Sequence, residues 1–127
     1  MKLAYAILKR SDIMKLVLSS QGHNKNDLVD VRFGRCNYFA VYDDVSKTFE
    51  FVENKGAESS QGAGIAAAQA VLDLKADVLL TERLGPKAYR VLAESGMKLY
   101  KCHGMTLEDA VNRFETHTYE TIDGPYR

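Results

Sequence analysis

The side chains of this chain best suited to metal ligation or nucleophilic chemistry are two cysteines and three histidines, namely Cys36, Cys102, His23, His103 and His117. Their spacing excludes several familiar sites. No C-x-x-C pair is present, so neither a zinc ribbon nor a thioredoxin-like redox motif is available. No H-x-x-x-H pair is present either, so zinc-hydrolase chemistry has no support. Each of these residues must act alone or with partners from distant parts of the sequence.

Cys36 is the more interesting of the two cysteines because it directly follows the cationic stretch Arg32–Arg35 (RFGR). A neighbouring positive charge favours the thiolate, which is the form that attacks electrophiles and binds metals. The alternative is a small apolar residue at a strand end, and this is the interpretation that we prefer for Cys102. For Cys36 both interpretations stay open. We take Cys36 and the loop residue His23 as the candidate metal ligands.

A Gly62-Ala63-Gly64 turn at the start of a predicted helix is suited to close approach of an anion to backbone N–H groups. It is neither G-x-G-x-x-G nor a P-loop, so the nucleotide-binding motifs fail. The alternative is a helix start that needs small residues for packing. Paired catalytic carboxylates are also missing, because Asp43 and Asp44 belong to a predicted hairpin turn.

The elements that must position these residues follow from hydrophobic periodicity. Five short strands are predicted, at Met14–Ser19, Cys36–Asp43, Thr48–Glu53, Ala76–Thr81 and Met97–Lys101. Three helices are predicted, at Gly62–Lys75, from Pro86 to a cap at Gly96, and after a capping residue at Thr106. The buried stripe of the first helix is expected to contain Ile65, Ala68, Val71 and Leu72.

This order of elements predicts a mixed five-stranded α/β sheet with strand order 3-2-1-4-5, in which strand 2 is antiparallel to the rest. All three helices then start at one edge of the sheet, with free N–H groups and positive dipole ends. The loops of that edge carry His23, Lys25, Arg32, Arg35, Lys55, Arg83, Cys102 and His103. The edge is therefore suited to an anion. Strands 2 and 5 would be roughly 14 Å apart, which excludes a disulfide between the two cysteines.

Composition limits the classes of function. The chain has 127 residues, of which 46% are hydrophobic and 27% are charged, as expected for one globular domain. Lys and Arg number 17 and Asp and Glu number 17, so the basic excess of a generic nucleic-acid binder is absent. No apolar run reaches the ~18 residues that cross a bilayer. Lys9 and Arg10 follow the apolar stretch Met1–Leu8, an order that does not predict a secretory signal. We expect a cytoplasmic monomer with reduced thiols and no nucleic-acid or membrane partner.

Three segments are predicted along the chain. Residues 1–13 are interpreted as an N-terminal appendage, because Met14 looks like a second beginning. Residues 14–115 form the predicted domain, and residues 116–127 form a C-terminal tail without a clear period.

Five short motifs, in this order and spacing, resemble one known family, the dinitrogenase iron-molybdenum cofactor biosynthesis domain. They are Arg32–Phe39 (RFGRCNYF), Gly62–Ala67 (GAGIAA), Asp77–Thr81 (DVLLT), Gly85-Pro86 and Gly96–Tyr100 (GMKLY). The family includes NifX, the NafY core, the C-terminal part of many NifB proteins and the orange protein. The resemblance covers Met14 to about Phe114. It implies a ribonuclease H-like three-layer α/β/α sandwich, in agreement with the predicted topology.

The resemblance also implies a role, which is to bind or carry an anionic molybdenum- or iron-sulfur cluster rather than to catalyse a reaction. Such a cluster, and a cluster-donor or cluster-acceptor protein, are then the expected partners. The expected cluster-binding residues are Arg35, Cys36, Gly62, Gly64, Arg83 and His103. The chain departs from the family pattern at Glu82, where glycine is frequent, and at Lys87, where asparagine is frequent. Glu82 would place a negative charge near the anion site, which Lys87 and Arg83 could offset.

Two other functions stay open. The domain could be a metal-free interaction or regulatory module on the same fold. It could also be a small enzyme that uses Cys36 as a nucleophile, but the sequence offers this residue no visible base.

Overall fold

The computed structural model describes residues 14–59, 61–116 and 119–126. The strands are β1 (Lys15–Ser20), β2 (Tyr38–Asp43), β3 (Thr48–Glu53), β4 (Val78–Thr81) and β5 (Lys98–Lys101). The helices are α2 (Ala63–Asp73), α3 (Pro86–Ser95) and α4 (Leu107–Thr116). The predicted appendage, residues 1–13, lies outside the described residues. No helix within the described ranges is long and apolar enough to cross a membrane.

The five strands form one mixed sheet in the order β3-β2-β1-β4-β5. Strand β2 pairs antiparallel with both β1 and β3, whereas β1, β4 and β5 are mutually parallel. Val17 of β1 lies between Val41 of β2 and Leu79 of β4. The predicted strand order and directions are confirmed. Since parallel strands end at the same side, the loops after β1, β4 and β5 share one edge of the sheet.

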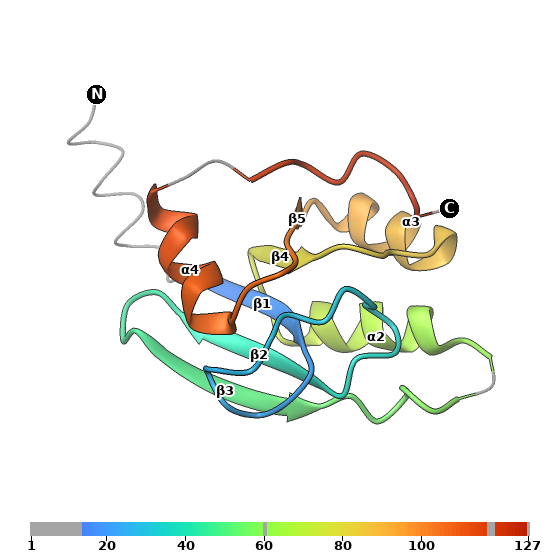
Figure 1. Cartoon of the computed structure of the whole chain (residues 1–127). Helices are drawn as coiled ribbons and strands as arrows, with labels where there is room; N and C mark the ends of the chain where they lie inside the picture. Colours follow the sequence, from blue (N-terminus) through green and yellow to red (C-terminus); the bar gives the residue numbers. More distant parts are fainter. Residues whose placement is uncertain (1–13, 60, 117–118, 127) are drawn as a thin grey trace.

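Each face of the sheet packs against its own helices, which gives three layers (Figure 1). On one face α2 and α3 lie together and bury a core that includes Val17, Phe39 and Leu79. On the other face α4 covers the alternate side chains, such as Leu16 and Leu80. Strand β4 is buried at all four residues because it lies between two strands and under helices on both faces.

The helix ends follow their sequence signals with one correction. Pro86 occupies the first turn of α3, and Gly96 caps its end with a φ of 85°. The predicted buried stripe of α2 is wrong at Ile65, which is 43% exposed. Ala67 is buried in its place, beside Ala68 and Val71 as predicted, since small side chains let α2 pack closely against both the sheet and α3.

The segment 119–126 packs along the outer edge of β5 and then reaches α3 (Figure 1). Thr121 forms an antiparallel bridge with Tyr100. Ile122 is 5% exposed and belongs to the core under α2 and α3. The sequence showed no period here because this segment is held by a few separate contacts rather than by a regular element.

Candidate functional site

Two helices begin side by side at the predicted edge. The N-cap residues of α2 and α3 are Gly62 and Gly85, and at neither helix start does a cap side chain accept a hydrogen bond from the first N–H groups. Gly62 has a φ of 76°, a conformation that only glycine adopts without strain. A Cβ added at Gly64 would lie 3.5 Å from the Cβ of Ala88, so the first turns of the two helices are in contact. Their positive dipole ends and backbone N–H groups therefore lie close together.

The third helix start does not share this property. The N–H groups of Leu107 and Glu108 donate to the carbonyl oxygens of Asp27 and Lys25, at 2.9 and 3.0 Å. The N–H of Asp109 donates to the hydroxyl of Thr106 at 3.1 Å. The expectation that all three helices offer free N–H groups is therefore wrong for α4, because the loop after β1 folds across this end and uses them.

The loop that carries the RFGR stretch packs directly against the start of α2. A Cβ at Gly34 would lie 3.1 Å from both the nitrogen and the Cα of Gly64. A Cβ at this position would press the two backbones apart, so the close approach favours glycine. This contact puts the neighbouring residue, Arg35, next to the first turn of α2.

Arg35 joins two loops through its guanidinium. Its Nη1 donates to the carbonyl oxygens of Ala57 and Ser59, at 2.7 and 2.6 Å. The Nε and Nη2 donors have no hydrogen-bond partner among the described residues. Arg35 is exposed, so these donors are available to a ligand in solution.

Two other cations of the edge are already engaged. Arg32 donates from Nε and Nη2 to the buried carboxylate of Asp30, at 3.2 and 3.0 Å, and this hydrogen bonding raises the pKa of Arg32. The guanidinium of Arg83 lies 4.9 Å from the centre of the Tyr126 ring. The N–H of Tyr126 donates to the carbonyl oxygen of Leu84 at 2.6 Å, which holds the ring in place. Arg83 is thus partly covered by the C-terminal segment.

Cys36 differs from the expectation. Its side chain is fully buried in the core under α2 and α3, and its Sγ lies 3.8 Å from Nδ2 of Asn54. Burial raises the pKa of the Cys36 thiol to about 12. Of the two interpretations left open for Cys36, burial favours the small apolar residue, because loss of hydration opposes the thiolate.

Cys102 lies in the other core, on the α4 face of the sheet. Burial raises the pKa of its thiol to about 11. Both cysteines are free. They lie on opposite faces of the sheet, which adds a second reason for the predicted absence of a disulfide.

The histidines have separate local partners. His23 lies edge-on to Tyr38, with ring centres 5.2 Å apart, and His103 contacts the carboxylate of Glu82 through Nδ1. His117 lies outside the described residues. Within the described ranges, no group of three or more His, Cys, Asp or Glu side chains is placed to hold a metal ion.

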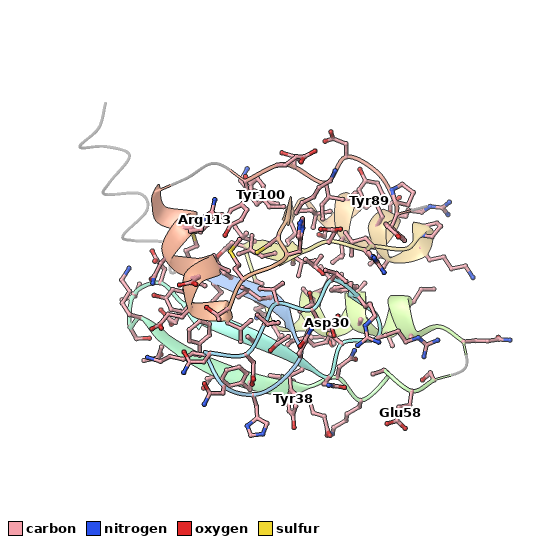
Figure 2. The ribbon with its side chains drawn as sticks, in the orientation of Figure 1. Asp30, Tyr38, Glu58, Tyr89, Tyr100 and Arg113 are labelled. Atoms are coloured by element: carbon pink, nitrogen blue, oxygen red, sulfur yellow. The ribbon has the colours of Figure 1, made fainter. Side chains whose placement is uncertain are left out.

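A surface hollow of about 700 Å³ lies beside the clamp that Arg35 forms. Tyr38 and Glu58, both labelled in Figure 2, belong to its lining. Its cations are Arg32, Arg35 and Lys55. Asn54, which the sequence analysis did not single out, also lines the hollow and is 7% exposed. In the sequence, the only signal for Asn54 was that it is a polar residue directly after a predicted strand.

The comparisons with known proteins show the family and the fold. The sequence model of a family described as dinitrogenase iron-molybdenum cofactor matches residues 14–117. The chain belongs to this family. Membership places it among proteins of iron-molybdenum cofactor biosynthesis or binding, and confirms the resemblance seen in the sequence.

Solved structures of similar proteins share the fold. The apo form of the orange protein from Desulfovibrio gigas has a TM-score of 0.85 and 36% identity, covering 91% of this chain and 98% of its own. A Thermotoga protein described as a putative NifB protein of the DUF35 family has a TM-score of 0.78 and 27% identity, covering 90% of this chain and 97% of its own. An uncharacterized protein of Methanocaldococcus jannaschii is 25% identical over 92 residues, which are 70% of this chain and 78% of that protein.

In the context of the iron-molybdenum cofactor family, the departure at Glu82 has a local explanation. Its carboxylate contacts His103 rather than standing alone at the edge. The carboxylate of Glu82 is therefore already engaged by a side chain of the same edge.

Proposed function

We propose that this protein binds and carries an anionic molybdenum- or iron-sulfur cluster, or a precursor of one, at the edge where α2 and α3 begin. Family membership supports this proposal. The similarity to the orange protein, whose structure was solved as an apo form, supports it further. The observation that carries it is the pair of helix starts in contact, both capped by glycine and neither capped by a side chain.

The paired helix starts favour an anion for two physical reasons. Each helix end carries about half a positive charge, and its first N–H groups lack intrahelical acceptors. One such contact contributes ~0.3–1 kcal/mol when exposed and up to ~2 kcal/mol when partly buried. Two adjacent ends therefore act together on a single multiply charged ligand, although the whole chain has no net charge.

In this proposal Arg35 and Arg83 have different side-chain contacts before the ligand binds. Arg35 is held by two carbonyl oxygens and still offers Nε and Nη2 to the ligand. Arg83 is exposed, and its guanidinium lies against the Tyr126 ring before the ligand binds. Gly62 and Gly64 supply backbone N–H groups and the space for close approach.

The same proposal assigns no metal ligation to Cys36, because a buried thiol with a raised pKa would first have to leave the core and lose its proton. His23 and His103 already contact Tyr38 and Glu82. The cargo is thus held by hydrogen bonds and charge, which predicts that its affinity falls as salt concentration rises.

Titration with tetrathiomolybdate under anaerobic conditions tests the proposal, because this dianion has a visible spectrum. We expect saturable spectral changes that weaken with added salt. Arg35→Ala should bind more weakly than Arg113→Ala. Arg113 is the matched control, because it lies in the last turn of α4 rather than at a helix start (Figure 2). Absence of binding by the wild-type protein, for tetrathiomolybdate and for cluster loaded anaerobically, would refute the carrier function and leave the metal-free interaction module.

A further inference from the structure

Asn54 connects the two loops that lie on either side of the Arg35 clamp. Its Nδ2 donates to the carbonyl oxygens of Gly34 and Cys36, at 3.1 and 2.9 Å. One side-chain nitrogen therefore holds both residues that flank Arg35 in sequence. The amide is buried, so these bonds are shielded from water and are costly to lose.

The backbone of Asn54 extends the same connection. Its N–H donates to the carbonyl oxygen of Asn37 at 3.0 Å, and its own carbonyl accepts from the N–H of Ala57 at 3.2 Å. Ala57 also accepts from the Arg35 guanidinium. The two loops are thus joined from inside by Asn54 and from outside by Arg35, and they form one unit.

This unit reaches the start of α2 through Gly34. The backbone of Gly34 is close enough to the Gly64 nitrogen that a Cβ would come within 3.1 Å of it. A shift of the loop would change two things at once, the position of Arg35 and the access to the first N–H groups of α2.

We propose that Asn54 is a positioning residue for the anion site, acting through Arg35 and Gly34 without touching the ligand. This inference rests on the proposed function, because it concerns the same site. An amide suits the task since one nitrogen carries two N–H donors for two carbonyl acceptors. A carboxylate of the same size has no donor and would face both carbonyl oxygens with a negative charge.

The experiment is a double-mutant cycle with tetrathiomolybdate as the probe. The dissociation constant is measured anaerobically for the wild type, Asn54→Ala, Arg35→Ala and the double variant, at a temperature where thermal melts show every protein folded. We expect Asn54→Ala to bind about tenfold more weakly, the size expected for one hydrogen bond to a charged group. The effect of the double variant should be smaller than the sum of the two single effects, because both substitutions act on the contact that Arg35 makes with the ligand.

A matched pair of substitutions separates position from charge. Asn54→Asp and Asn37→Asp both add a negative charge to the lining of the same hollow. Among the residues that the structure describes, however, the Asn37 amide donates only to the carbonyl oxygen of Gln21, at 2.9 Å. Asn54→Asp should therefore weaken binding clearly more than Asn37→Asp. If Asn54→Ala does not fold, Asn54→Ser replaces it in the cycle, because a hydroxyl retains one donor.

The outcomes distinguish the two proposals. Wild-type binding with a non-additive cycle supports the role of Asn54. Wild-type binding with unchanged affinity in Asn54→Ala, or with effects that simply add to those of Arg35→Ala, overturns that role and leaves the carrier function intact. Lack of binding by the wild type overturns both.

Discussion

Replacing Cys36 by serine distinguishes between the two ways in which an anionic cluster could be held. If the thiolate of Cys36 ligated a metal, the substitution would remove the ligand and most of the bound colour. If charge and hydrogen bonds hold the cargo, Cys36→Ser should bind nearly as well as the wild type. We expect the second result, and we expect Arg35→Ala to cost more than Cys36→Ser.

The magnitudes favour charge over ligation. Burial raises the pKa of Cys36 from 9.0 to about 12, which corresponds to about a thousandfold smaller thiolate fraction, or about 4 kcal/mol. Metal ligation by Cys36 would have to overcome this cost and also the cost of moving its side chain out of the core. Loss of the hydrogen bonds of Arg35 to a charged ligand is worth about 1.5–3 kcal/mol, or about 10- to 100-fold in affinity.

Visible titration with tetrathiomolybdate provides the assay, and reaction with a thiol reagent provides an independent one. In the native protein at pH 7.5, neither cysteine should react until the chain unfolds, since both side chains are buried. A large loss of bound colour in Cys36→Ser, with Arg35→Ala unaffected, would refute this reasoning. Rapid labelling of Cys36 in the folded protein would also contradict it.

Three further predictions concern stability. The free energy of unfolding should fall as pH rises above 9, by about 1.4 kcal/mol per pH unit for each thiol. The reason is that folding raises the pKa of Cys36 to about 12 and that of Cys102 to about 11, from an ordinary value of 9.0. Alanine at both positions should flatten this fall in denaturant titrations. Tyr126→Ala should cost about 0.5–1 kcal/mol of stability, because it removes the aromatic ring from the neighbouring guanidinium, whereas Tyr126→Phe should be neutral in the same titration. Gly34→Ala should cost about 1–3 kcal/mol, because its Cβ meets the backbone of the first turn of α2; Gly124→Ala, which meets no atom within 4 Å, is the control and should leave the midpoint unchanged.

Local patterns were enough to predict the arrangement of the sheet. The alternation in Thr48–Glu53 and the apolar run ending at Thr81 each correspond to a strand, and Pro86 and Gly96 bound α3 as expected. The connections then fix the strand order, because a hairpin pair followed by right-handed crossovers has few compact solutions. This also places the helix starts and the candidate loops at one edge.

What each charged or reactive side chain does at that edge depended on tertiary contacts. The sequence places Cys36 beside arginines, but only the packed core shows that its sulfur points away from water. It places Arg83 at the edge without revealing the Tyr126 ring over it, and it gave no sign that the loop after β1 closes the start of α4.

The physical reason for this division is the range of the forces involved. Periodicity and caps depend on neighbours within about one turn or one strand, so a linear sequence records them. Burial and hydrogen-bond partners depend on residues far along the chain, as in the bond from Asn54 to Gly34 across 20 positions. The sequence by itself determined which loops and helix starts meet at the candidate edge, and the tertiary structure decided which of their groups are free to bind a ligand.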